Sequence, residues 1–171
     1  MHMITVIVTV EENGTQQLAK TLENLISYAL EGFVQEVVVL HDALDDMTRH
    51  LAEEAGCNLV ENKNFQAVCS DARGDWLLFM EAGAVLAAGW ADIVSAHANA
   101  DGGAASFQLT VSNARPFWQR LFKPRVFKSP LARGLLISKR QARANFKSQA
   151  TAVELMRGLA VKRLRAKIIR A

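Results

Sequence analysis

Runs of apolar residues, many of them β-branched, alternate along the first half of the chain with segments of helical apolar spacing. The runs cover residues 4–10, 37–40 and 76–80, and a shorter one covers residues 58–60. Continuous apolar runs of this length are typical of strands that a parallel sheet buries on both faces. We therefore predict four strands before residue 81.

Helical spacing fills the intervals between these strands. Leucines and isoleucines recur every three or four residues within about 15–31, and a second helix is predicted for about 44–55 and a third before Gly74. Gly32 and Gly56 end the first two. Strand and helix thus alternate from residue 4 to residue 80, which predicts an open, mostly parallel α/β sheet with right-handed crossovers.

The second half of the chain has a different character. A helix at about 91–100, a strand at 104–111 and a strand at 134–138 are predicted, followed by two basic helices at about 139–145 and 151–169. No internal repeat and no linker rich in Pro, Gly or Ser interrupts the sequence. A single domain, residues 1–171, is expected.

Charge is distributed very unevenly. Residues 1–114 hold 4 of the 20 Lys and Arg and 16 of the 17 Asp and Glu, a net charge of −12, while residues 115–171 hold the other 16 basic residues and only Glu154, a net charge of +15. Such asymmetry predicts that the basic part meets an anionic partner or the acidic part of its own fold.

Composition and motifs exclude several classes of protein. Half of the residues are hydrophobic and 22% are charged, which is unlike a disordered or collagen-like chain. No apolar run is long enough to span a membrane, and two cysteines without zinc-ligand spacing favour a reduced, cytoplasmic protein. A lone Gly14 after the first strand is neither a dinucleotide fingerprint nor a Walker loop, which argues against dehydrogenases and P-loop enzymes.

Residues 72–90 contain a longer pattern. They read Ala-Arg-Gly-Asp, then Leu-Leu-Phe, and end in Gly-Trp. This order, without a gap, resembles the metal-binding strand of the family 2 glycosyltransferases of the GT-A fold, and residues 4–13 and 41–46 resemble the two earlier strand ends of that family. The resemblance implies a three-layer α/β domain of the nucleotide-diphospho-sugar transferase type. It also implies transfer of a sugar from a nucleotide-sugar donor, in the synthesis of a cell-envelope glycan.

The resemblance assigns roles by position. Thr9, Glu11, Asp42 and Arg73 would bind the nucleotide, Asp42 by accepting a hydrogen bond from the base. Glu81 would hold a divalent cation, Mn²⁺ or Mg²⁺, that neutralises the diphosphate leaving group.

The chain departs from the family pattern at three places. Gly83 stands where the second metal-binding aspartate is expected, so a second ligand would have to come from Asp42 or Asp75. The acidic pair that supplies the catalytic base falls on residues 151–152, which leaves Glu154 as the candidate base. Glu11 replaces a tyrosine that would stack on the nucleotide base.

Three hypotheses follow from the sequence. The chain is a nucleotide-sugar-dependent glycosyltransferase, or a catalytically inactive relative kept for binding or assembly, or a module that binds an anionic membrane or RNA. Aromatic and basic residues alternate within 115–128, and their spacing predicts a helix with one apolar face. Such a helix suits an anionic membrane surface or a lipid-linked acceptor at the inner face of the membrane. Buried rings argue against stacking on bases, so nucleic acid is not expected as a partner.

Overall fold

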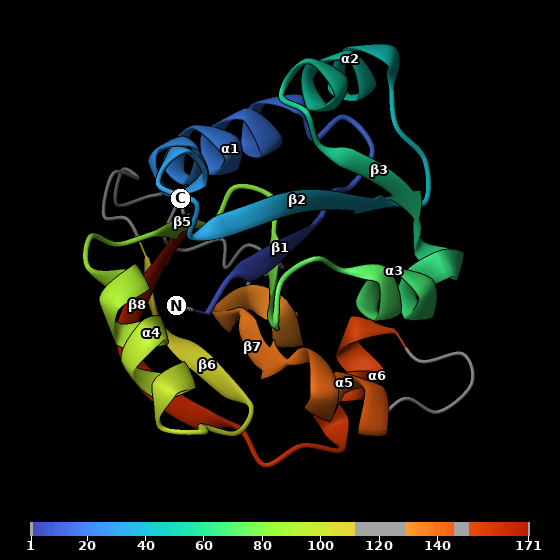
Figure 1. The fold of residues 1–171 in the computed structure, drawn as a ribbon. Helices are drawn as coiled ribbons and strands as arrows, with labels where there is room; N and C mark the ends of the chain where they lie inside the picture. Colours follow the sequence, from blue (N-terminus) through green and yellow to red (C-terminus); the bar gives the residue numbers. More distant parts are fainter. Residues whose placement is uncertain (1, 112–128, 146–150, 171) are drawn as a thin grey trace, which may run out of the picture.

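The computed structural model describes residues 2–111, 129–145 and 151–170, and the predicted helix within 115–128 lies outside them. The chain forms one mixed eight-stranded sheet between two layers of helices, which confirms the predicted three-layer α/β fold (Figure 1). The strand order is β3-β2-β1-β4-β7-β6-β8-β5. In chain order the strands are β1 (Ile4–Thr9), β2 (Val34–His41), β3 (Asn58–Glu61), β4 (Trp76–Glu81), β5 (Val85–Leu86), β6 (Ala105–Val111), β7 (Leu135–Ser138) and β8 (Lys162–Arg170).

The first four strands in the order, β3, β2, β1 and β4, are parallel to one another. Beyond β4 the direction reverses at β7, and β6 then pairs with β8 in parallel. Strand β1 lies in the middle of the parallel half and is buried on both faces, as its unbroken run of β-branched residues predicts.

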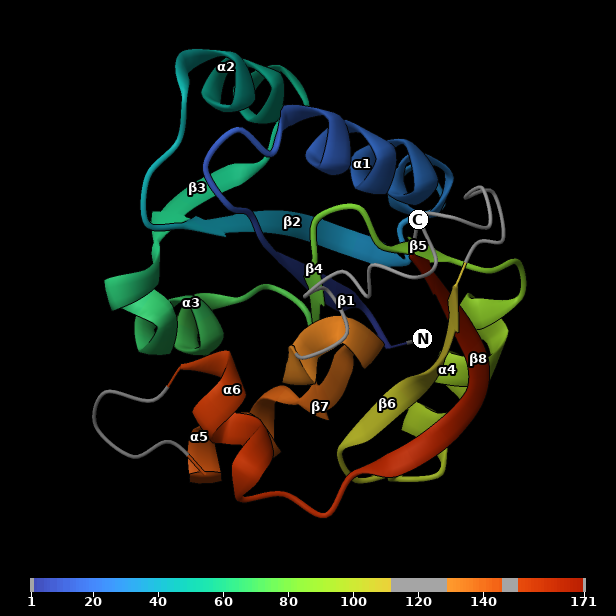
Figure 2. The same ribbon diagram turned by 180° about the vertical axis from the view of Figure 1, so that it is seen from behind.

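Helices cover the two faces of the sheet in separate groups, and both groups can be seen in Figures 1 and 2. The first group is α1 (Thr15–Leu30), α2 (Asp46–Glu54) and α4 (Trp90–Asn99), and its core includes Leu18, Trp90 and Val94. The second group is α3 (Phe65–Asp71), α5 (Lys139–Asn145) and α6 (Ala152–Arg157), with the 3-10 turns η1 (Asn62–Asn64) and η4 (Pro130–Arg133).

Trp90 anchors the first of these layers. Its ring is fully buried and meets Tyr28 and Phe33 edge to face, with ring centroids 5.0 and 5.4 Å apart. Edge-to-face packing of this kind adds stability beyond the burial of apolar area. The Gly-Trp end of the 72–90 pattern therefore serves to fix α4 against α1.

One element was predicted wrongly. Residues 151–169 were expected to form a single basic helix, but the helix ends at Arg157 and residues 162–170 form strand β8. The burial of β8 alternates: Leu164, Ala166 and Ile168 are buried while the residues between them are exposed or half-buried. Because the apolar positions have a period of two, they appear scattered on a helical wheel, and this scatter was the sign of a strand.

The short strand β5 was also not predicted, because two residues carry no periodic signal. It pairs with the end of β8 through Val85 and Leu86. The described part of the chain contains no helix long and apolar enough to cross a membrane.

Candidate functional site

The carboxyl ends of β1, β2 and β4 meet at one edge of the sheet and bring together most of the residues assigned from the sequence. Thr9 and Glu81 are register partners on adjacent parallel strands, so their side chains project from the same face. The Thr9 hydroxyl donates to the Met80 carbonyl oxygen over 3.2 Å. Glu11 and Asp42 follow the ends of β1 and β2 and are exposed. In open α/β sheets this is the edge at which ligands bind.

Glu81 already has a cationic partner within the chain. The Arg170 guanidinium, at the end of β8, donates from Nη1 to Glu81 Oε2. The two side chains are only 11% and 20% exposed, so water screens this ion pair weakly. Strand β8 brings Arg170 here because its last residues pair with β5, which directly follows the turn after Glu81.

The turn that follows Glu81 is fixed by helix α1. The Gly83 amide donates to the Thr21 hydroxyl and to the Gln17 carbonyl oxygen, each over 2.9 Å. The Thr21 hydroxyl in turn donates to the Ala84 carbonyl oxygen. The buried Thr21 hydroxyl therefore takes part in two hydrogen bonds, and these hold the turn against α1.

Gly83 itself adopts a left-handed backbone conformation, with φ of 89°. A side chain at this position would strain the backbone, and its Cβ would lie 3.4 Å from Gln17 Cγ. The position at which the family pattern has an aspartate is thus shaped here for a residue without a side chain.

The groups present at this edge do not fit a divalent cation. Among the residues that the structure describes, no three His, Cys, Asp or Glu side chains converge. Asp75 precedes β4 and lies about 20 Å from Glu81, six residues away along an extended strand. Asp42 is separated from Glu81 by strand β1, about 10 Å across two strand spacings. Asp75 is therefore too far away to share a cation with Glu81, and Asp42 with Glu81 offers at most two carboxylates, one of them already paired with Arg170.

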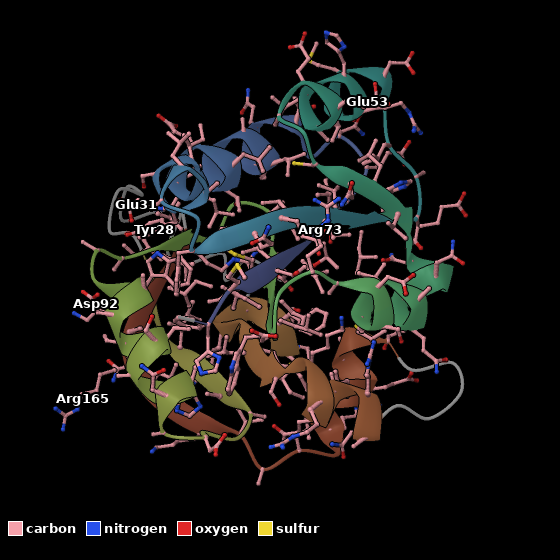
Figure 3. All side chains as sticks on the ribbon, viewed as in Figure 1. Tyr28, Glu31, Glu53, Arg73, Asp92 and Arg165 are labelled. Atoms are coloured by element: carbon pink, nitrogen blue, oxygen red, sulfur yellow. The ribbon has the colours of Figure 1, made fainter. Side chains whose placement is uncertain are left out.

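Arg73 lies at the opposite edge of the sheet from Thr9 and Glu81. Its backbone amide donates to Glu36 Oε1 over 2.6 Å, and its guanidinium stands 3.8 Å from Glu36 Oε2 (Figure 3). The neighbouring Gly74 packs so closely on β1 that an added Cβ would lie 2.5 Å from the Thr5 nitrogen. The Ala-Arg-Gly-Asp part of the pattern thus attaches β4 to β1, and the structure does not bring Arg73 together with the other assigned residues.

Glu154, the candidate base, has a structural role in α6. Its carboxylate accepts from the Thr151 amide over 2.9 Å, while the Thr151 hydroxyl accepts from the Glu154 amide over 3.3 Å. This reciprocal pair is a capping box, which satisfies amides at the start of a helix. Asp45 caps the start of α2 by accepting hydrogen bonds from Thr48. These hydrogen bonds lower the pKa of its carboxyl group.

One residue at the carboxyl edge was missed by the sequence analysis. Arg170 was placed just past the end of a predicted helix, and only the alternation of apolar and basic residues along 162–170 could have located it. His41, the last residue of β2, is buried, and its Nδ1 has no hydrogen-bond partner in the described part of the chain.

Two grooves in the described structure lie elsewhere. One, of about 460 Å³, runs beside α3 and is lined by Glu36, Val38 and Arg73 among others. A second, of about 650 Å³, lies at the amino end of β4 near Asp75 and Lys139. The site at the carboxyl edge rests on strand geometry, not on these grooves.

Comparisons with known proteins find similarity in fold but not in sequence. No model of a protein family and no curated protein matches the sequence. Solved structures do match: glucosyl-3-phosphoglycerate synthase of Mycobacterium tuberculosis has a TM-score of 0.64 and 15% identity. TarS of S. aureus has a TM-score of 0.66 and 15% identity, and mannosyltransferase PcManGT of Pyrobaculum calidifontis has 0.67 and 17%.

These matches cover 99% of this chain but 71%, 37% and 57% of the three other chains, respectively, so this chain spans only part of them. Two of the three proteins were solved with Mn²⁺, the synthase with uridine diphosphate and the mannosyltransferase with GDP-mannose, and TarS was also solved with UDP. At such low identity the likeness establishes the fold. The chain has a GT-A-like fold, similar to that of glycosyltransferases.

Proposed function

We propose that this chain binds a nucleotide-sugar at the carboxyl edge of β1, β2 and β4, as a glycosyltransferase homologue, and that it does so without a divalent cation. The observation that carries the proposal is the ion pair between Glu81 and Arg170. In this fold Glu81 occupies the position expected for a metal ligand, and the chain's own cation neutralises it there.

The roles follow from the geometry of the edge. Thr9 and Glu11 line the nucleotide pocket, and the exposed Asp42 carboxylate accepts a hydrogen bond from an N–H of the base.

Arg170 takes the part of the cation near the diphosphate. A guanidinium has five N–H donors in a planar fork, and among described residues Glu81 is the one acceptor to which it donates. The remaining donors suit phosphate oxygens, to which arginine binds in a bidentate manner. The positive charge that stabilises a bound or departing diphosphate is then supplied by the protein.

A second candidate is a catalytically inactive GT-A-like protein that serves in binding or assembly. The observation in its favour is that both candidate carboxylates are engaged, Glu81 by Arg170 and Glu154 by the capping box of α6. A carboxylate held in such contacts is poorly placed to take the proton of an acceptor hydroxyl, because its oxygens are already occupied. Donor binding without turnover would identify this case.

The cellular setting is part of the same proposal. By its resemblance, the domain would act in cell-envelope glycan synthesis, on a lipid-linked acceptor at the cytoplasmic face of the membrane. The net charge of +15 in residues 115–171 supports an anionic surface or acceptor as the partner.

A thermal-shift panel tests the proposal. UDP-, GDP- and dTDP-sugars are added in millimolar amounts in the presence of EDTA, with free phosphate as the control. A ligand present at 100 times its dissociation constant stabilises the folded state by about 2.7 kcal/mol, which raises the unfolding temperature measurably. We expect a rise with one nucleotide. An unfolding temperature that none of the three nucleotide-sugars raises would rule out donor binding and with it the proposed function.

A further inference from the structure

Three exposed basic side chains form a row on the outer face of β8. Arg163, Arg165 and Lys167 alternate with Leu164, Ala166 and Ile168, which are buried in the core. Because successive side chains of a strand point to opposite faces, the three cations share one face. Figure 3 shows the labelled Arg165 extending away from the ribbon.

This row is unoccupied by any described part of the protein. None of the three cations has an ion pair or hydrogen bond to a side chain that the structure describes, in contrast to Arg170 on the same strand. Helix α4 packs on the opposite, buried face of β8, and the second group of helices lies over β4 and β7 instead (Figure 2). Unpaired and exposed, these charges keep their full attraction for an anionic partner.

The shape of the row selects the class of partner. Alternate residues of a strand are about 6.7 Å apart, so the three charges lie along a line of roughly 13 Å. On the neighbouring strand β6 the residues in register with Lys167 and Ile169 are Gln108 and Thr110, both polar. The large exposed apolar residues of the described chain are on other elements: Met3, Ile26, Leu30 and Met47. Among the residues that the structure describes, this face thus presents no fully exposed large apolar side chain for a bilayer and no aromatic platform for nucleic-acid bases.

We propose that Arg163, Arg165 and Lys167 bind a linear phosphate-bearing polymer that lies along β8. The row runs toward the carboxyl end of β8: Lys167 is three residues, or about 10 Å, from Arg170, whose side chain projects from the opposite face of the strand. A polymer held on the row therefore has a segment close to the carboxyl edge of the sheet. Binding to the row does not require the nucleotide, so this inference stands or falls independently of the proposed function.

Long-chain polyphosphate, fluorescently labelled and followed by anisotropy with the full chain, is the probe. The test variant R163Q/R165Q/K167Q removes three charges from the row. The control K20Q/R49Q/R140Q removes three other exposed charges, from α1, α2 and α5, so both variants have the same net charge. All six positions are exposed, and a thermal melt of each variant checks that it is folded.

We expect the row variant to bind polyphosphate at least about tenfold more weakly and the control to bind like the natural chain. Each phosphate contact contributes roughly 0.7 to 0.9 to the slope of log affinity against log salt, so the row variant should lose about 2 from that slope. Equal weakening by both variants would overturn the proposal, because binding would then follow net charge alone.

Three further experiments identify which kind of anionic partner the row binds. Tripolyphosphate competing as well as the polymer at equal molar concentration would show a site for a small anion and contradict the proposal. Tighter binding of single-stranded RNA than of polyphosphate, at equal phosphate concentration, would indicate recognition of bases. Vesicles of phosphatidylglycerol that bind in a row-dependent manner, while polyphosphate does not bind, would assign the face to a membrane. We expect none of these outcomes.

Discussion

Glu81 and Arg170 are held opposite each other by two segments 89 residues apart in sequence. Each charge is mostly buried, and a buried charge is tolerated when a partner of opposite sign is in hydrogen-bonding contact. The pair therefore stabilises the junction of β4 and β8 only as long as both members are present.

Replacing one member should cost more than replacing both. We expect Arg170→Met to lower the free energy of unfolding by about 3 kcal/mol, because it leaves the Glu81 carboxylate without its counter-charge. The double variant E81Q/R170M should recover a large part of that loss. Urea unfolding of the two single variants and the double variant measures the coupling. Equal stability of R170M and the natural chain would mean that the ion pair does not contribute to the free energy of unfolding.

Gly83 offers a direct test of whether a metal site can be restored. Asp at this position must adopt a φ of 89°, and we expect a cost of about 1–2 kcal/mol. G83A is the matched control, because it has the same backbone strain without a carboxylate. Neither variant should gain stability from Mn²⁺ in a thermal melt. A rise with manganese in G83D alone would show that the edge accepts a cation after all.

The two cysteines should react slowly with thiol reagents. Burial raises the pKa of Cys57 to about 11 and that of Cys69 to about 12, and Cys69 has no exposed surface. At pH 8 the reactive thiolate is therefore scarce in the folded state and more abundant in the unfolded state. Iodoacetamide labelling followed by mass spectrometry should show protection of both, lost in urea. Fast native labelling of Cys69 would contradict its burial.

Single residues explain how far the 72–90 pattern was informative. Gly74 and Trp90 match the family pattern because the fold needs them, the glycine for close contact with β1 and the tryptophan for the core. The pattern therefore predicted the fold, while the two site residues taken from it, Arg73 and Glu81, lie at opposite ends of β4. Arg73, part of the same match, lies at the other edge because residues before and after a strand are at opposite ends of it.

At the scale of elements, helix α1 acts as a support for the turn between β4 and β5. The Asn24 amide donates to the Leu86 carbonyl oxygen and accepts from the Leu86 amide, over 3.2 and 2.8 Å. With the contacts of Thr21, this attaches both ends of the turn to one helix. The segment that carries Glu81 and Gly83 is thereby held in place in the absence of a metal.

Removing one of these contacts should loosen the turn locally. In Asn24→Ala, the Leu86 amide loses its acceptor, and we expect its hydrogen exchange to accelerate while that of β1 amides such as Val6 stays unchanged. The loss of the two hydrogen bonds should cost about 1–3 kcal/mol. Exchange followed by NMR or mass spectrometry resolves the two regions. Uniform acceleration throughout the sheet would mean that Asn24 supports the whole fold and not the turn.

The elements also show where sequence analysis reached its limit. The parallel strands and α1 were predicted because long apolar runs and a 16-residue amphipathic helix give strong periodic signals. β8 was misassigned because its nine residues, in which apolar and basic side chains alternate, were interpreted with a helical period. Its pairing with β6 and β5 depends on contacts that no local pattern encodes.

For the whole molecule, the structure gives the excess of basic residues in the C-terminal third two separate explanations. One basic residue of the C-terminal third, Arg170, neutralises an acid of the first part, as the sequence allowed. Others, in the row on β8, face outward without a partner among described residues and remain available for an anionic ligand. The sequence predicted the imbalance but could not divide it between these uses, because that division depends on strand pairing.

The central claim is that Arg170 replaces a divalent cation at a nucleotide site, and calorimetric titration tests it most directly. UDP and GDP, and the nucleotide-sugar that gives the largest thermal shift, are titrated into the natural chain and into Arg170→Met, each in EDTA and in Mn²⁺. We predict equal affinity with and without metal for the natural chain, and affinity at least about tenfold lower, or 1.4 kcal/mol, in the variant. Binding that requires Mn²⁺, or that is unchanged by loss of Arg170, would contradict the account.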